Sequence, residues 1–129
     1  MLAIDTNIVI RFLTRDHEAL ARRALEIVGN NEVFVPLTVV LEAEWVLRDV
    51  YEMPRDEVIR ELRRFCGLEH VTVGAADIVE RALAYAEGGL DVADALHLAQ
   101  ATECEAFVTL DKPLARKARR FPEARVRLA

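Results

Sequence analysis

The stretch Leu2-Ala3-Ile4-Asp5-Thr6-Asn7 decides the fold, because an apolar run followed at once by an acid is typical of a buried strand that ends at a site. In open α/β sheets, ligands bind in the crevice at the carboxyl ends of the strands. Asp5 directly follows this run and is therefore the first candidate functional residue. Thr6 and Asn7 have side chains that can cap the helix expected next. The alternative is that Asp5 itself only caps this helix.

The length and composition of the chain are those of one folded domain. We expect a single domain over residues 1–129, because this length can bury one core but not two. Hydrophobic residues make up 53% of the chain and charged residues 30%, which is typical of a globular protein rather than a disordered one. No apolar run is long enough to cross a bilayer, and Asp5 and Arg11 interrupt the segment where a secretion signal needs an apolar core. We therefore expect a cytoplasmic protein without a membrane partner.

The cysteines and the net charge narrow the possible functions. Cys66 and Cys104 lack any metal-binding spacing, so we expect them to be reduced, small and buried. A net charge of -5 argues against a protein that coats nucleic acid by bulk attraction. Positive charge gathers instead near the C-terminus, which indicates either a solvated face or a local contact with phosphate. The residues of this cluster are Arg116, Lys117, Arg119, Arg120, Arg125 and Arg127.

Short apolar runs alternate with helical patterns along the whole chain. After the first strand, strands are expected at 33–35, 71–73 and 106–109, with a short last one around Val126. A short helix follows Asp5, and further helices are expected at 18–28, 39–51, 56–65, 76–87, 92–103 and 112–120, the first of these capped by Asp16. Helices between short strands favour parallel pairing through right-handed crossovers. The sequence therefore predicts an α/β fold, with a thin parallel sheet of four or five short strands flanked by helices in a three-layer α/β/α arrangement.

Three of the expected helices carry more apolar surface than such a thin sheet can cover. These are the helices at 18–28, 39–51 and 56–65. Apolar surface left over in this way indicates a homodimer or a partner helix that docks in a groove.

The helix at 39–51 contains two acids with different surroundings. At about 100° per residue, Val39, Ala43 and Val46 form an apolar arc, and Glu42 lies at its edge. Glu44 points away from this arc and has Arg48 one turn on, which indicates a surface ion pair. No cation stands one turn beyond Glu42, so its carboxylate is the candidate functional group of the two.

Three further acids occur at element boundaries in the second half of the chain. Asp91 stands where an N-cap is expected, and a helix dipole explains an acid at this place without any function. Asp94 shares a helix face with Leu98, which turns it toward the core. Asp111 follows the strand at 106–109, and thus lies, like Asp5, at the carboxyl end of a strand.

Asp5, Glu42, Asp94 and Asp111 together would form a group of four carboxylates, with no Lys or Arg placed locally to neutralise each one. Crowded carboxylates repel one another, and protonation or a divalent cation relieves the repulsion. Hard oxygen ligands favour Mg²⁺ or Mn²⁺, and such an ion can polarise a phosphodiester and lower the pKa of a bound water.

Four motifs in order resemble the PIN-domain family, and within it the VapC-type toxins of prokaryotic toxin-antitoxin pairs. The motifs are Asp5-Thr6-Asn7, Leu41-Glu42-Ala43-Glu44-Trp45-Val46-Leu47, Asp91-Val92-Ala93-Asp94-Ala95-Leu96 and Thr109-Leu110-Asp111-Lys112. Each is weak alone, but their order and spacing cover essentially the entire chain. Val92 departs from the pattern, because the family often has Phe there.

The resemblance implies a metal-dependent endoribonuclease that uses Mg²⁺ or Mn²⁺. It implies that Asp5, Glu42, Asp94 and Asp111 form the acidic site, with Asp91 as an accessory acid. It also implies that three polar residues orient the carboxylates and water, namely Thr6, Asn7 and Thr109. A small VapB-type antitoxin is the implied partner, with an amphipathic helix on the toxin and an Arg or Lys at the acidic pocket.

Several neighbouring residues have two interpretations. Lys112 either contacts RNA phosphate or balances the charge of Asp111, and Arg116 and Lys117 are further candidates for RNA contact. His97 is expected to have a structural or peripheral role, because imidazole suits Zn²⁺ better than Mg²⁺. Trp45 is expected in the core or on a dimer face.

Two other classes of protein have similar acids. A phosphoacceptor receiver domain needs an Asp at the end of its central strand, but the run 71–73 leads into Gly74 before any acid. A phosphatase with an Asp nucleophile on the first strand needs a second acid two residues on, where this chain has Asn7. A PIN fold that acts only as a binding module has no reason to keep four mutually repelling acids.

Overall fold

A computed structural model describes all residues of the chain, 1–129. Its contacts divide the chain into two compact units, Met1–Ala76 and Asp77–Ala129. None of its helices combines the length and the apolar character needed to cross a membrane.

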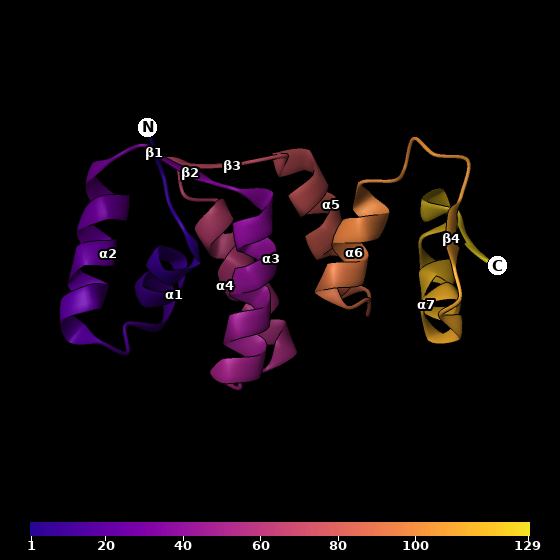
Figure 1. The fold of residues 1–129 in the computed structure, drawn as a ribbon, viewed down its shortest axis with the longest axis horizontal. Coiled ribbons are helices and arrows are strands. Elements are labelled where there is room, and N and C mark those ends of the chain that lie inside the picture. The colour runs from indigo at the N-terminus through magenta and orange to yellow at the C-terminus, as the bar shows by residue number, and fades with distance from the viewer. The chain divides into compact units, whose positions relative to one another are not determined.

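The first unit contains a parallel sheet of three strands in the order β1-β2-β3. The strands are β1 (Leu2–Ala3), β2 (Val33–Val35) and β3 (Val71–Val73). Leu2 lies opposite Val33, and Val33 lies opposite Val71, so the three strands begin level with one another. Figure 1 shows them side by side along one edge of this unit, with its helices extending from that edge.

Four α-helices fill the rest of the first unit: α1 (Thr6–Thr14), α2 (Glu18–Asn30), α3 (Leu37–Trp45) and α4 (Arg55–Cys66). A π-helical turn, η1 (Val46–Val50), continues α3. Large side chains on the inner faces of these helices are fully buried, among them Leu47, Leu62 and Phe65. Phe12 packs edge-on against Phe65 at 5.2 Å between ring centres, which joins α1 to α4.

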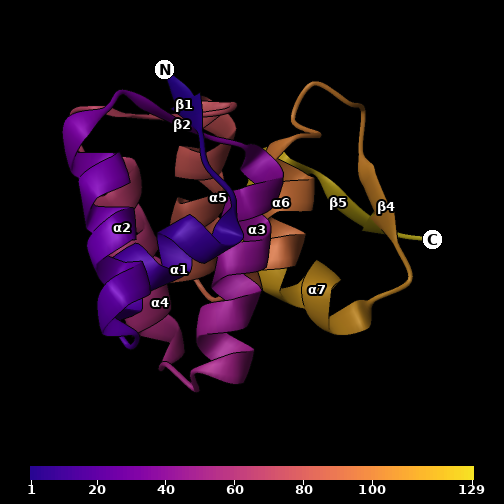
Figure 2. The ribbon, with the colours of Figure 1, turned by 60° about the vertical axis from the view of Figure 1, so that its left-hand side comes forward.

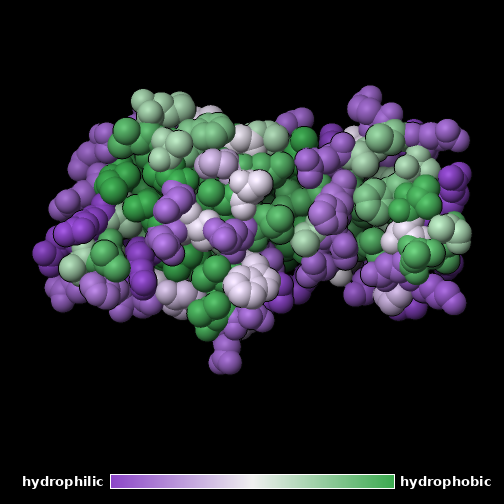
Figure 3. Space-filling model, in the orientation of Figure 1, coloured by the Kyte–Doolittle hydropathy of each residue, from purple (hydrophilic) through white to green (hydrophobic).

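The second unit contains a parallel pair of strands, β4 (Phe107–Thr109) and β5 (Val126–Leu128). Its helices are α5 (Ala76–Glu87), α6 (Val92–Ala99) and α7 (Lys112–Lys117), followed by the 3-10 turns η2 (Ala118–Arg120) and η3 (Pro122–Ala124). Figure 2 shows β4 and β5 side by side, with α7 on the segment that joins them. Exposed hydrophobic side chains gather over this strand pair in Figure 3, and they include Val108, Leu110 and Leu128.

The predicted α/β fold class with short parallel strands between helices is confirmed. The expected single sheet is not seen, because hydrogen bonds join the five strands as one group of three and one pair. Each strand has only two or three residues, so each makes few backbone hydrogen bonds. The first strand was also expected to be buried, but Leu2 and Ala3 are exposed and only Ile4 behind them is buried.

Two predicted helix boundaries are wrong, one through a neighbouring residue and one at a contact with another helix. Asp16 does not cap α2, because His17 is the N-cap and its Nδ1 accepts a hydrogen bond from the Leu20 N–H at 3.3 Å. The helix expected at 92–103 ends at Ala99. There, the guanidinium of Arg81 on α5 donates a hydrogen bond at 3.1 Å to the carbonyl of Ala99, which satisfies a carbonyl at the helix end.

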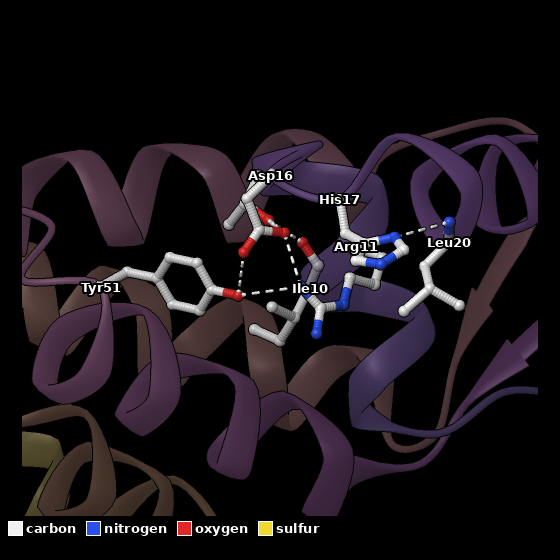
Figure 4. Close-up of polar contacts among 7 residues, drawn as sticks. Ile10, Arg11, Asp16, His17, Leu20 and Tyr51 are labelled. Atoms are coloured by element: carbon white, nitrogen blue, oxygen red, sulfur yellow. Dashed lines mark hydrogen bonds and ion pairs between the residues drawn. The ribbon is translucent and has the colours of Figure 1, made fainter.

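Asp16 instead lies in a polar cluster on the first unit. Arg11 forms an ion pair with Asp16 at 2.7 Å, and the Tyr51 hydroxyl donates a hydrogen bond to the other carboxylate oxygen at 2.8 Å. Figure 4 shows Asp16 between these two side chains, which come from α1 and from the end of η1. The cluster thus fastens the connection between α1 and α2 to a segment far along the chain.

The cysteines are both free. Cys66 is half-buried, and this burial raises the pKa of its thiol to about 11. Cys104 is exposed, so the expectation that both are buried is wrong for this residue. It lies in the turns between α6 and β4, where no helix or strand covers it.

Candidate functional site

Asp5 caps the first helix. Its Oδ1 accepts a hydrogen bond from the Ile8 N–H at 3.3 Å. The alternative interpretation, in which Asp5 caps the helix, is therefore correct for this contact. The expected caps Thr6 and Asn7 are instead the first two residues of α1, because Asp5 has taken the cap position. A carboxylate has about four lone-pair sites and this bond uses one, so Asp5 retains oxygen lone pairs for a ligand. Its side chain is exposed, as is that of Asn7.

Glu42 is held in place by Thr6. The buried Thr6 hydroxyl donates a short hydrogen bond to Oε1 of Glu42, which joins the start of α1 to the middle of α3. Glu42 is an exposed residue, and no other hydrogen bond to its carboxylate is present. This arrangement fixes the direction of the carboxylate without surrounding it, as a ligand-binding acid requires.

The assignment of Glu44 to the surface is wrong. Glu44 is only 3% exposed, and its Oε1 pairs with Nε of Arg48 at 2.8 Å. The buried face of α3 consists of Val40, Ala43 and Glu44 and continues with Leu47 in η1. This face differs from the predicted arc, which begins at Val39, because apolar residues occur on both sides of the helix and periodicity does not distinguish them. The ion pair itself was predicted and is present, and it offsets the cost of burying the carboxylate.

The second unit contains Asp91, Asp94 and Asp111. Asp91 occupies the N-cap position of α6, but its side chain makes no capping hydrogen bond. Asp111 does cap α7, because its Oδ1 accepts from the Leu114 N–H at 2.9 Å. The backbone N–H of Asp111 donates to Oγ1 of Thr109 at 3.0 Å, so Thr109 fixes the turn that carries Asp111 rather than its carboxylate.

The charges of Asp91 and Asp111 affect the pKa of Asp94. Partial burial raises the pKa of Asp94, and the negative charges of Asp91 and Asp111 raise it further. The positive charges of His97 and Lys117 act in the opposite direction on this pKa. The charges of Asp91 and Asp111 therefore both repel the carboxylate of Asp94, and a bound cation would relieve that repulsion.

Sequence reasoning missed the position of Lys117. The sequence indicated either a solvated face or a phosphate contact for Lys117, whereas its charge acts on Asp94 from α7 and weakens the premise that no Lys or Arg is placed near the acids. A lysine on a different helix could be found only from the tertiary structure. His97 and Lys112 are exposed, as is Arg116.

Trp45 lies on the surface of the first unit. It is 50% exposed, so of the two expected places the core is excluded and a dimer face stays a prediction. Its direction follows from the buried face of α3, which passes through Glu44 and leaves Trp45 outside.

The candidate acids are divided between the units: Asp5 and Glu42 belong to the first, and Asp91, Asp94 and Asp111 to the second. No group of three or more His, Cys, Asp or Glu side chains is arranged so that it could hold a metal ion. The chemistry of the donors nevertheless fits Mg²⁺ or Mn²⁺, because all five are carboxylates and these ions prefer oxygen ligands.

Comparison with known proteins identifies one family. The model of the PIN domain matches residues 2–120, and the match spans both units and all the candidate acids. A search of curated proteins finds no match.

Proposed function

The chain belongs to the PIN-domain family, a nuclease-type fold that generally works with divalent metal ions, and on this premise we propose that it is an Mg²⁺- or Mn²⁺-dependent endoribonuclease. The observation that carries the proposal is the grouping of Asp91, Asp94 and Asp111 in the second unit, where partial burial and the charges of the other two acids raise the pKa of Asp94. Asp111 also caps α7, but Asp91 makes no capping hydrogen bond, and acids whose charges act on a shared neighbour have a use in binding a cation.

The proposal assigns metal binding to Asp5, Glu42, Asp94 and Asp111, with Asp91 as an accessory acid. When bound, a divalent ion supplies polarisation of the phosphodiester and a more acidic water. Thr6 holds the Glu42 carboxylate in one direction. Asn7 orients water, and Thr109 holds the turn that presents Asp111. Lys112, Arg116 and Lys117 offer positive charge to the phosphates of RNA.

The direct test is cleavage of a mixed panel of tRNA, rRNA fragments and mRNA by the purified protein. We expect cleavage with Mg²⁺ or Mn²⁺, none with EDTA, and none from Asp5→Asn or Asp94→Asn. Asp49→Asn is the matched control, because Asp49 is an exposed acid outside the four motifs. Thermal melting of each variant shows whether it is folded.

Two results would contradict the proposal. The first is cleavage that persists in EDTA, and the second is cleavage that survives in both site variants. A folded protein that binds metal but cuts no RNA in the panel would favour the alternative of a non-catalytic binding module. The receiver alternative is set aside, because the chain is a PIN domain and no acid follows β3.

We further propose that the protein is a cytoplasmic VapC-type toxin that forms a homodimer and binds a VapB-type antitoxin. A pocket of about 460 Å³ between α1 and α4 offers a place where the antitoxin could bind, and so supports the proposal of this partner. It is lined by Phe12, Leu13, Arg15, Glu61, Arg64, Phe65 and Leu68. The exposed Trp45 supports a dimer face.

Co-expression with the adjacent open reading frame followed by size exclusion tests both the antitoxin partner and the homodimer. A monomer that is harmless to its host would contradict the toxin assignment.

A further inference from the structure

The charge of the chain is divided unevenly. Residues 112–129 contain seven Lys and Arg and a single acid, Glu123, so this segment has a formal charge of +6 in a chain of net charge -5. The segment folds into α7, the 3-10 turns and β5 of the second unit. Strong positive charge on a short folded segment of an acidic protein indicates a local site for an anion.

A pocket of about 260 Å³ lies within this basic segment. Its apolar lining comes from α7, the two 3-10 turns and the start of β5, and its charged residues are Arg119 and Arg125. The whole lining consists of Ala115, Ala118, Arg119, Phe121, Pro122, Arg125 and Val126. It contains no acid and none of the residues proposed to bind metal.

Of the two arginines that line the pocket, Arg125 has a hydrogen-bond partner in the protein and Arg119 has none. The Arg125 guanidinium donates to the carbonyl of Thr102, which anchors it at the pocket edge. The neighbouring Arg120 donates to the carbonyl of Gly88 at 3.1 Å. Arg119 is exposed and makes no hydrogen bond or ion pair, so its five donors are available to a ligand.

The rigid base of the pocket positions these arginines. Phe121 packs on Tyr85 of α5 with 4.6 Å between ring centres, and Ala118 beneath Arg119 is buried. A mostly apolar lining that includes an arginine without a partner suits a phosphate diester, whose charge binds Arg119 while its sugar contacts the apolar residues.

We propose that this pocket binds a backbone phosphate of single-stranded RNA, and that it holds the substrate at a point separate from the carboxylates. The inference rests on the proposed function for the identity of the polyanion. It adds a positioning role for Arg119, which acts on substrate affinity and not on the chemical step.

The test measures binding of a labelled single-stranded RNA to the full chain by fluorescence anisotropy, in EDTA so that no cleavage occurs. Arg119→Ala is compared with Arg119→Lys and with Arg23→Ala, an exposed arginine of α2 in the first unit. Each phosphate contact changes the slope of log affinity against log salt by about 0.7, which corresponds to about fivefold in affinity between 1 M and 0.1 M salt.

We expect Arg119→Ala to weaken binding about fivefold at 0.1 M salt and to lower the salt slope by about 0.7, equally for RNAs of different sequence. Arg119→Lys should retain the slope, and Arg23→Ala should bind as the unchanged protein does. Equal effects of Arg119→Ala and Arg23→Ala would overturn the inference, as would competition by polyglutamate as strong as that by unlabelled RNA.

The failures of the two proposals are distinguishable. If metal-dependent cleavage occurs but Arg119→Ala binds RNA normally, only the pocket assignment is wrong. If the unchanged protein neither binds nor cuts RNA, both proposals fail. Displacement of the RNA by inorganic phosphate alone at low millimolar concentration would overturn the assignment to RNA in favour of a site for a free anion.

Discussion

At the scale of single residues, Thr6 is the side chain with the clearest positioning role. Replacing Thr6 with Val keeps the shape but removes the hydroxyl that donates to Glu42. We expect metal affinity to fall about 10- to 100-fold, as is usual when a partner of a metal-binding side chain is lost. Titration of cleavage activity with Mg²⁺ or Mn²⁺ measures this, and Thr6→Ser, which restores the hydroxyl, should recover the affinity. An unchanged metal titration in Thr6→Val would show that Glu42 needs no support.

The sequence allowed the candidate acids to be named but not their surroundings. Asp5 and Asp111 were recognisable because each follows a short apolar run, and both do cap helices at those places. The burial of Glu44 was not predicted, because α3 has apolar residues on two of its faces. Periodicity alone therefore could not show which of these faces is buried. The effect of Lys117 on Asp94 comes from a separate helix and has no signal in local sequence.

At the scale of elements, the Asp16 cluster joins the α1–α2 connection to η1, and its contribution depends on pH. Hydrogen bonds from Arg11 and Tyr51 lower the pKa of Asp16 from 3.8 to about 2. A lowered pKa means that the folded state favours the carboxylate, so the stabilisation is present above about pH 4 and is lost as the pH falls through about 2. We expect Asp16→Asn to lower the melting temperature at neutral pH and to match the unchanged protein near pH 2. Asp49→Asn is the control, and an equal loss in both variants at pH 7 would count against the cluster.

Gly88 is a second element-scale feature, at the end of α5. A Cβ at this position would lie 2.2 Å from Cζ of Phe121, and this ring also packs on Tyr85. We expect Gly88→Ala to lower the free energy of unfolding by about 1–3 kcal/mol, the usual cost of overpacking. Gly29→Ala is the matched control, because a Cβ there meets nothing within 4 Å. Denaturant unfolding measures both, and equal stability of the two variants would show that Phe121 moves aside freely.

Most helices and strands were predictable because each has its own periodic pattern and its own boundary residue. The run 33–35 became β2, and the helix expected at 76–87 has the bounds of α5. The end of α6 was not predicted, and the contact made there by Arg81 comes from another helix and has no signal in the local sequence. The same holds for the pairing of five strands as two sheets, which depends on hydrogen bonds between distant segments.

At the scale of the whole molecule, the prediction of a single domain can be tested by unfolding. The family match spans residues 2–120 and therefore both compact units. We expect both units to unfold together, because the chain is short for two independent cores. Hydrogen exchange measured by mass spectrometry on peptides from each unit should give the same free energy for the slowest amides. Two separate values, or two transitions in denaturant, would mean that the units fold independently.

The parallel register of the first sheet also has a consequence for the order of folding. Leu2 pairs with Val33, and Val33 with Val71, so each pairing closes a chain segment of more than thirty residues in return for a strand of two or three. Closing long segments costs conformational entropy before the few hydrogen bonds can form, whereas helices gain their bonds locally. We therefore expect the helices to form early and the sheet late. Asp5 follows the strand β1, so it reaches its final position only when the chain has almost completed folding, and a nascent or partly folded chain has no assembled site.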